Sequence, residues 1–269
     1  MVKIPSVLKG WGGKAYLADK IIGLMPKHLT YVELFFGTGA VLFAKPYQGT
    51  SEIVNDISRE LTTFWRVLQN PKTFEEFSRR VACTPFSQIE FRDAVDFLDK
   101  EDIIKDEVDV AVAFFVRCRQ SREGRGHSFA TMVKSRTRRE MNECCAAYLT
   151  AINGLPAIHD RLKRVLILND DAVKVIQQID NGNTVFYADP PYVHSTRVTK
   201  DAYEYEMSDQ QHKELLDTLC DLRGKFLLSG YHSDLYDDYA TQQGWNTHEF
   251  PIDCKPGNTP RVEVVWTNF

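Results

Sequence analysis

Apolar residues along this chain follow two patterns, one typical of buried strands and one typical of amphipathic helices. Short apolar runs that end in glycine or acid predict strands, and they cover residues 30–36, 52–56, 164–168, 184–188 and 225–229. Between residues 58 and 160 the apolar positions recur at helical spacing instead, as in Leu61, Phe64, Trp65 and Leu68. We therefore predict a sheet whose strands lie, in sequence, on both sides of a long helical insertion.

The order of these elements favours a parallel sheet. The first strand runs into Gly37-Thr38-Gly39, the next apolar residues open a helix, and the second strand ends at Asp56. Strand, helix and strand in this order form a βαβ unit. The tail predicts a closing antiparallel hairpin from residues 248–250 and 261–267. We expect residues 1–57 and 161–269 to form one domain and residues 58–160 to form a second, helical domain.

Composition narrows the class of protein. A hydrophobic content of 43% with 26% charged residues is typical of a soluble globular chain. No apolar run approaches the ~20 residues of a membrane span, and the N-terminus lacks the apolar stretch of a signal peptide, so we expect a cytoplasmic protein without a membrane partner. The six cysteines show no C-x-x-C spacing. We expect them to be reduced thiols, with neither zinc nor another metal bound.

Charge is distributed unevenly along the chain. The whole chain has a formal net charge of -4, yet the segment from Arg117 to Glu140 carries eight lysines and arginines against two acids. A solvated loop usually mixes the two signs, whereas one basic segment on an acidic protein is suited to a polyanion. This basic segment therefore indicates a nucleic-acid partner.

Two features near the first strand indicate a nucleotide-like ligand. Gly37 and Gly39 lie where the strand gives way to a helix, so the backbone there can approach a ligand closely. Asp56 ends the next strand, where a carboxylate can accept hydrogen bonds from ribose hydroxyls. Each feature alone also occurs in ordinary tight turns and helix caps.

The tetrapeptide Asp189-Pro190-Pro191-Tyr192 follows a predicted strand and therefore lies at the carboxyl edge of the sheet, where α/β folds bind ligands. The prolines fix the backbone and donate no hydrogen bonds. The Asp189 carboxylate and the Pro190 carbonyl are thus two acceptors for the two hydrogens of a conjugated amino group. The aromatic ring of Tyr192 is a face on which an extruded base can stack. The alternative is a rigid acidic turn without a chemical role, but such a turn does not require an acid, two prolines and a tyrosine in succession.

These motifs together resemble those of the Dam-type (D12 class) DNA adenine methyltransferases, in particular their phage and prophage members. The resemblance spans nearly the whole chain and adds Gly12-Gly13-Lys14, Glu33 to Gly39 and the tail Arg261 to Asn268 to the tetrapeptide. Many members have an aromatic residue four positions before the motif lysine; Gly10 stands there in this chain, and we expect Trp11 to serve instead. The resemblance implies S-adenosylmethionine as cofactor, with contacts from Trp11, Lys14, Glu33, Phe35, Gly37, Gly39, Asp56, Asp171 and Asp189.

The resemblance also implies an α/β, Rossmann-like fold with a seven-stranded mixed sheet, and it makes the helical insertion a target-recognition domain. The implied activity is methylation of the N6 amino group of a flipped-out adenine in double-stranded DNA, with GATC as the expected target. Asp189, Pro190, Pro191 and Tyr192 are the implied catalytic residues. We expect a monomer or weak dimer in a bacterial or phage-infected cell, associated with the nucleoid through DNA. The expected DNA contacts are Arg117, Arg119, Gln120, Arg122, Arg125, Lys134, Arg136, Arg138 and Arg139.

Four other functions remain open from the sequence. Enzymes that methylate glutamine or RNA use a related tetrapeptide that begins with asparagine, and cytosine N4 methyltransferases often begin theirs with serine. A DNA-binding regulator without activity would not need the intact tetrapeptide. A hydride-transferring enzyme of the same fold leaves the tetrapeptide unexplained. The acid at position 189 and the basic insertion favour adenine in DNA.

Overall fold

The computed structural model describes residues 4, 6–9, 14–47, 49–100, 104–124, 126–130, 136–193, 205–252 and 261–269. Contacts divide the chain into two compact units. The helical unit comprises Met1–Asp19, Gly37–Pro46 and Ser58–Ile167, and the sheet unit comprises Lys20–Phe36, Tyr47–Ile57 and Leu168–Phe269. The functional division at residues 58 and 160 stays a prediction.

The main sheet has seven strands in the order β5-β2-β1-β6-β7-β9-β8. Strands β1, β2, β6 and β7 run parallel, whereas β9 is antiparallel to both of its neighbours, β7 and β8. This mixed seven-stranded sheet confirms the predicted fold class, and the β8–β9 pair confirms the predicted hairpin. The bounds are β1 Thr30–Glu33, β2 Ser51–Asn55, β5 Val165–Leu168, β6 Thr184–Ala188, β7 Lys225–Gly230, β8 Asn246–Ile252 and β9 Arg261–Thr267.

Strand order reverses between β1 and β6, which lie side by side in the sheet although their paired residues Thr30 and Thr184 are far apart in the sequence. The two strands are parallel, so their carboxyl ends meet at one edge of the sheet. An open α/β sheet binds its ligand at such a switch point. The residues that directly follow β1 and β6 are therefore candidates for a ligand-binding site.

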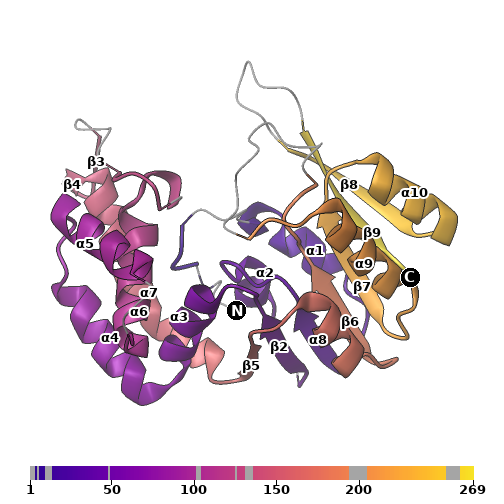
Figure 1. Cartoon of the computed structure of the whole chain (residues 1–269), viewed down its shortest axis with the longest axis horizontal. Coiled ribbons are helices and arrows are strands. Elements are labelled where there is room, and N and C mark those ends of the chain that lie inside the picture. The colour runs from indigo at the N-terminus through magenta and orange to yellow at the C-terminus, as the bar shows by residue number, and fades with distance from the viewer. Residues whose placement is uncertain are drawn as a thin grey trace. The chain divides into compact units, whose positions relative to one another are not determined.

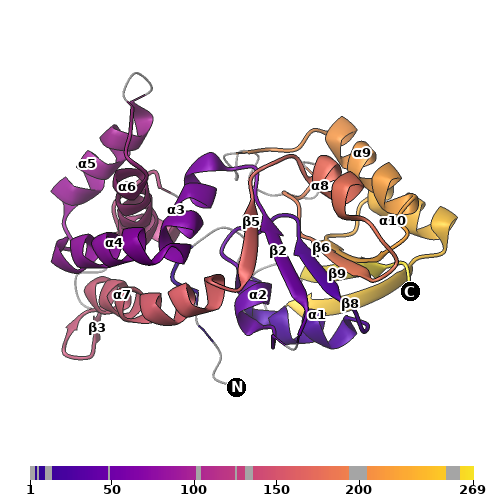
Figure 2. The same ribbon diagram turned by 90° about the horizontal axis from the view of Figure 1, so that it is seen from below.

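Helices cover both faces of the sheet. In Figure 2, α8 (Ala172–Ile179), α9 (Asp209–Cys220) and α10 (Asp234–Gln243) lie on one face, and α1 (Ala18–Leu24) lies on the other. The first face has a continuous apolar core in which Leu216 of α9 and Phe186, Phe226 and Trp266 of the strands are fully buried. Burial of such large side chains stabilises the sheet unit by roughly 1.5–3 kcal/mol each.

The helical unit is built from five longer helices, which Figure 1 shows gathered together. Sequence signals fix several of their starts: the side chain of Ser58 caps α3, that of Ser87 caps α5, and Pro71 occupies the first turn of α4, where its missing N–H costs nothing. The bounds are α3 Arg59–Gln69, α4 Pro71–Cys83, α5 Gln88–Asp99, α6 Glu107–Gln120 and α7 Glu143–Leu162. Shorter elements are η1 Lys14–Tyr16, α2 Ala40–Ala44, η2 Arg122–Gly124 and a separate hairpin of β3 Thr137–Arg138 and β4 Met141–Asn142.

Aromatic residues form the core of the helical unit. Phe64 of α3 packs against Trp65 with ring centroids 4.7 Å apart, against Phe77 of α4 at 5.8 Å, and against Phe114 of α6 at 5.7 Å. Edge-on and tilted pairs of this kind add about 0.5–1.5 kcal/mol each beyond area burial. The helical unit thus has a hydrophobic core of its own.

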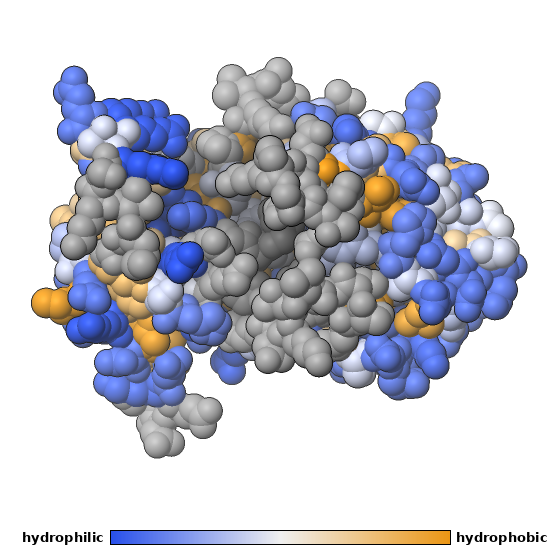
Figure 3. Space-filling model, turned by 90° about the horizontal axis from the view of Figure 1, so that it is seen from above, coloured by the Kyte–Doolittle hydropathy of each residue, from blue (hydrophilic) through white to orange (hydrophobic). Residues whose placement is uncertain are grey.

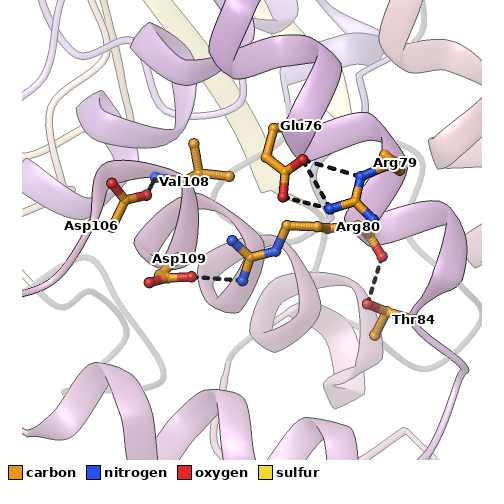
Figure 4. A network of polar contacts seen from close by, with 7 residues as sticks. All are labelled: Glu76, Arg79, Arg80, Thr84, Asp106, Val108 and Asp109. Atoms are coloured by element: carbon orange, nitrogen blue, oxygen red, sulfur yellow. Dashed lines mark hydrogen bonds and ion pairs between the residues drawn. The ribbon is translucent and has the colours of Figure 1, made fainter.

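Polar contacts between α4 and α6 lie at the edge of this core (Figure 4). Arg80 donates to Asp109 at 2.6 Å, Asp106 caps α6 through the Val108 N–H at 2.8 Å, and Glu76 pairs with Arg79 within α4. Pairs this exposed contribute little stability, about 0–1 kcal/mol. Of these contacts, the Arg80–Asp109 pair joins the two helices, and the other two are local to α4 and to the start of α6.

One face of the molecule is drawn in Figure 3. In the view of Figure 3 the described surface is dominated by hydrophilic residues, with apolar residues in small scattered groups. No helix in the described part of the chain is long and apolar enough to cross a membrane.

Candidate active site and nucleic-acid interface

Asp189 directly follows β6, whose five residues are all buried. The strand is anchored at its end because the Leu34 N–H donates to the Tyr187 carbonyl at 2.9 Å and the Tyr187 hydroxyl lies 3.1 Å from the Ser229 hydroxyl. Asp189 itself is half-buried, and Pro190 is buried. The acidic side chain is therefore carried by a rigid strand end at the switch point of the sheet.

Tyr192 is held at two points. Its hydroxyl donates to Glu263 Oε1 at 2.6 Å, and its ring centroid lies 4.5 Å from that of Tyr231 with the two planes 57° apart. Glu263 is fully buried on β9, while Tyr192 is half-buried. The last residue of the tetrapeptide is thus fixed by Glu263 of β9 and by Tyr231, the residue directly after β7.

Tyr236 of α10 is a buried neighbour of this region. Burial raises the pKa of its phenol, and the negative charge of Asp189 raises that pKa further. The phenol oxygen lies 2.9 Å from His212 Nδ1, and His212 is also fully buried. Tyr236 therefore stays a neutral phenol near the Asp189 carboxylate.

The end of β1 carries another buried acid. Glu33 accepts a hydrogen bond from the Tyr31 hydroxyl at 2.9 Å, and burial together with the Glu33 charge raises the pKa of Tyr31 well above its usual value. Phe35 packs against the apolar core of the sheet unit. Glu33, the last residue of β1, and Phe35, two residues beyond it, therefore both belong to the sheet unit.

The glycine turn that follows belongs to the helical unit. Gly37 has φ 49° and Gly39 has φ 69°, a left-handed conformation that L side chains rarely adopt, and a Cβ on Gly37 would meet nothing within 4 Å. Glycine at position 37 is therefore required by backbone conformation rather than by crowding within the chain. Lys14, also in this unit, is only 3% exposed. Trp11 lies outside the described residues.

Asn55 is a structural residue that the sequence analysis missed. Its amide nitrogen donates to the carbonyls of Leu34 at 3.1 Å and Asp170 at 2.9 Å, and its oxygen accepts from the Asp170 N–H at 3.0 Å. It thereby ties the end of β2 to the residues after β1 and β5. An asparagine at the end of an apolar strand, immediately before Asp56, was the available signal.

The two predicted acids beside Asn55 are positioned by backbone contacts. Asp56 is half-buried, and its carbonyl accepts from Asn169 Nδ2 at 2.7 Å. Asp171 is exposed and caps α8, since its carboxylate accepts from the Val173 N–H at 2.9 Å. The backbone of Asp56 and the side chain of Asp171 are thus held at the ends of β2 and β5, next to each other in the sheet.

The first part of the basic segment is largely buried. Arg117 pairs with Glu60 at 2.6 Å with 14% of its side chain exposed, and Arg119 donates to the Ala147 carbonyl at 2.5 Å. Burial lowers the pKa of Arg119. Gln120 has no exposed surface; it accepts from the Ser87 N–H at 3.0 Å and donates to the Pro85 carbonyl at 2.8 Å. These bonds argue against direct base reading by Gln120, Arg117 and Arg119.

The second part of the basic segment is exposed. Arg122 is exposed beside η2, and Arg136, Arg138 and Arg139 are exposed on the β3–β4 hairpin. Its turn is formed by Arg139 at φ 54° and Glu140 at φ 62°, and non-glycine residues rarely adopt such angles. Arg125 and Lys134 lie outside the described residues. Within the described part of the basic segment, the cations that face solvent are thus those of this hairpin and Arg122 in η2.

Within the described part of the chain, no three histidine, cysteine, aspartate or glutamate residues are grouped so that they could hold a metal ion. Five cysteines, Cys83, Cys118, Cys144, Cys145 and Cys220, are free thiols.

Comparison with known proteins gives a family and distant structural neighbours. The rRNA methyltransferase aviRa from Streptomyces viridochromogenes is 11% identical with a TM-score of 0.41, over 98% of this chain and 90% of that chain. A suspected rRNA-methylase from Clostridium thermocellum is 9% identical with a TM-score of 0.40, over 97% and 98%. Likenesses this weak say nothing about which nucleic acid this chain modifies. No curated protein matches the sequence.

The family profile is far more specific. The profile of D12 class N6 adenine-specific DNA methyltransferases matches residues 11–249, a span that includes the glycine turn, Asp56, the basic segment and the tetrapeptide. The chain belongs to the D12 class N6 adenine-specific DNA methyltransferase family.

Proposed function

We propose that this protein transfers the methyl group of S-adenosylmethionine to the N6 amino group of a flipped-out adenine in double-stranded DNA. The observation that carries the proposal is the tetrapeptide itself: Asp189 stands half-buried at the carboxyl end of β6, and Tyr192 is restrained beside it. Membership of an adenine-specific family supports adenine as the base.

The chemistry needs acceptors for the amino hydrogens. The nitrogen of an adenine amino group is a poor nucleophile because its lone pair is delocalised into the ring. Asp189 accepts one N–H and the Pro190 carbonyl accepts the other, which favours the pyramidal, nucleophilic form in the transition state. Tyr192 stacks on the base after it leaves the duplex. Bound S-adenosylmethionine supplies the electrophilic methyl group.

The residues present fit this cofactor. The left-handed glycines at 37 and 39 leave their backbone open to a close approach, and Asp56 and Glu33 are acids suited to ribose hydroxyls and an ammonium group. We propose the family assignments for the cofactor contacts, namely Trp11, Lys14, Glu33, Phe35, Gly37, Gly39, Asp56, Asp171 and Asp189.

For DNA, we propose that the exposed cations make the first contacts and that the buried ones support them. Arg122, Arg136, Arg138 and Arg139 face solvent, where arginine can pair with phosphate or with a guanine edge. Gln120 and Arg119 instead hold the end of α6 in place through their backbone contacts. GATC is the proposed target sequence.

The test is mass spectrometry of nucleosides from unmethylated DNA incubated with the protein and S-adenosylmethionine. N6-methyladenine is expected, and methylation of cytosine alone would overturn the proposal. Asp189→Ala should abolish turnover at saturating cofactor, because its contact acts in the transition state. Asp56→Ala should instead weaken cofactor binding by about 1–3 kcal/mol. Asp238→Ala, exposed on α10, is the control and should change neither property.

A further inference from the structure

Glu263 is an unusual residue for the middle of a sheet. It has no exposed surface, it lies on β9 in register with Phe250 of β8, and its Oε1 accepts the Tyr192 hydroxyl at 2.6 Å. A buried carboxylate costs free energy that an apolar residue of similar size would not. Stability of the sheet therefore does not account for an acid at this position.

Three segments of the sheet unit meet at one ring. Gly230, the last residue of β7, lies opposite Val264 of β9; Tyr231 directly follows Gly230, and Glu263 directly precedes Val264. Tyr231 packs against the Tyr192 ring with centroids 4.5 Å apart, and Glu263 holds the hydroxyl of the same ring. A hydrogen bond at one end and a ring contact at the side together restrict rotation of the Tyr192 side chain.

We propose that Glu263 is a positioning residue for methyl transfer: it fixes the plane of the Tyr192 ring before the base arrives, with Tyr231 as the lateral support. This inference rests on the proposed function, because the fixed ring matters only if a base stacks on it. A preset platform saves the entropy of ordering the tyrosine during each turnover, so its loss should affect kcat more than binding of either substrate.

The test uses Glu263→Leu, Glu263→Gln and Tyr192→Phe, with kcat and KM measured at saturating S-adenosylmethionine on unmethylated bulk DNA. Glu263→Leu should lower kcat about tenfold, the worth of one hydrogen bond to a charged group. Glu263→Gln keeps an acceptor oxygen and should recover part of the loss. Tyr192→Phe should also lower kcat, and the double variant Tyr192→Phe with Glu263→Leu should be no slower than the slower single variant.

Two comparisons separate positioning from mere stability. Tyr239→Phe removes a tyrosine–carboxylate hydrogen bond of the same 2.6 Å length, to Asp217 on the surface, and should leave kcat unchanged. Thermal unfolding measures the folded fraction of Glu263→Leu, and its kcat per folded molecule should still be about tenfold lower, because the Tyr192 hydroxyl has lost its acceptor.

The inference would be overturned by additive losses in the double variant, by an unchanged kcat in Tyr192→Phe, or by a loss of kcat in Glu263→Leu that follows a loss of folded protein. A wild-type protein that forms no N6-methyladenine would instead overturn the proposed function. In that case the thermal stabilities of the same variants would still decide whether Glu263 and Tyr192 are coupled.

Discussion

Replacing Asn55 by alanine should lower the free energy of unfolding by about 1.5–4.5 kcal/mol. The side chain is 1% exposed and makes three hydrogen bonds, two to Asp170 and one to Leu34. Each of these hydrogen bonds contributes about 0.5–1.5 kcal/mol net, and removal of the Asn55 side chain leaves the carbonyl of the fully buried Leu34 without this donor. Their sum sets the expected range.

Urea unfolding followed by circular dichroism measures this loss, and Asn181→Ala is the matched control. Asn181 also makes two backbone hydrogen bonds, to Ile179 at 3.1 Å and from Asn183 at 3.0 Å, but it is exposed. Water can replace those bonds, so its loss should stay below about 1 kcal/mol. Asn55→Asp, which cannot donate to the two carbonyls, should be at least as harmful as Asn55→Ala. A loss in Asn55→Ala no larger than that in Asn181→Ala would refute the reasoning.

Three further predictions concern other parts of the molecule. Gly224→Ala should destabilise the fold by about 1–3 kcal/mol, because its Cβ would lie 2.7 Å from the Thr184 carbonyl. Gly182 has open space around it, so Gly182→Ala should leave the stability unchanged, and thermal unfolding measures both variants. Asp237 and Glu249 raise the pKa of His232, so the stability that His232 contributes is full below about pH 6.5 and is lost as the pH rises through the raised pKa. His232→Gln should remove this pH dependence of stability, and a titration that shows a lowered pKa for His232 would contradict the prediction. Each of the variants Arg136→Ala, Arg138→Ala and Arg139→Ala should weaken DNA binding if the side chain contacts phosphate, and should reduce by about one unit the slope of log affinity against log salt concentration. An unchanged slope in the triple variant would exclude the hairpin from the DNA interface.

Periodicity was a sound guide to the fold because each pattern reflects burial. The apolar runs at 184–188 and 225–229 became the central strands β6 and β7, and the spacing of Leu61, Phe64, Trp65 and Leu68 became the buried side of α3. Helix caps such as Ser58 and Asp171 are equally local features, because their side chains bond to N–H groups two or three positions further along the chain. The short hairpin β3–β4 was not, because its turn uses Arg139 and Glu140 rather than the glycine or asparagine that signals such a turn.

The pattern of apolar and polar residues could not predict hydrogen-bond partners that are distant in the sequence. Gln120 looked like a base reader because it stands among arginines, but its amide is satisfied by Ser87 and Pro85, more than thirty residues away. Asn55 and Glu263 likewise gain their importance from contacts across 115 and 71 positions. The identity of a polar residue predicts that it needs partners, whereas only the folded chain shows which partners it has.

The boundary between the two units has a consequence for protein engineering. It falls between Phe36 and Gly37, inside the glycine-rich motif, and the Gly37 carbonyl accepts from Trp65 Nε1 at 3.1 Å while Phe43 packs on the same indole at 5.5 Å. A chimera that exchanges only residues 58–160 between relatives would therefore replace the indole under a turn that stays behind. An exchange of these helices therefore has to carry residues 37–46 with them, or keep Trp65 and its neighbours native.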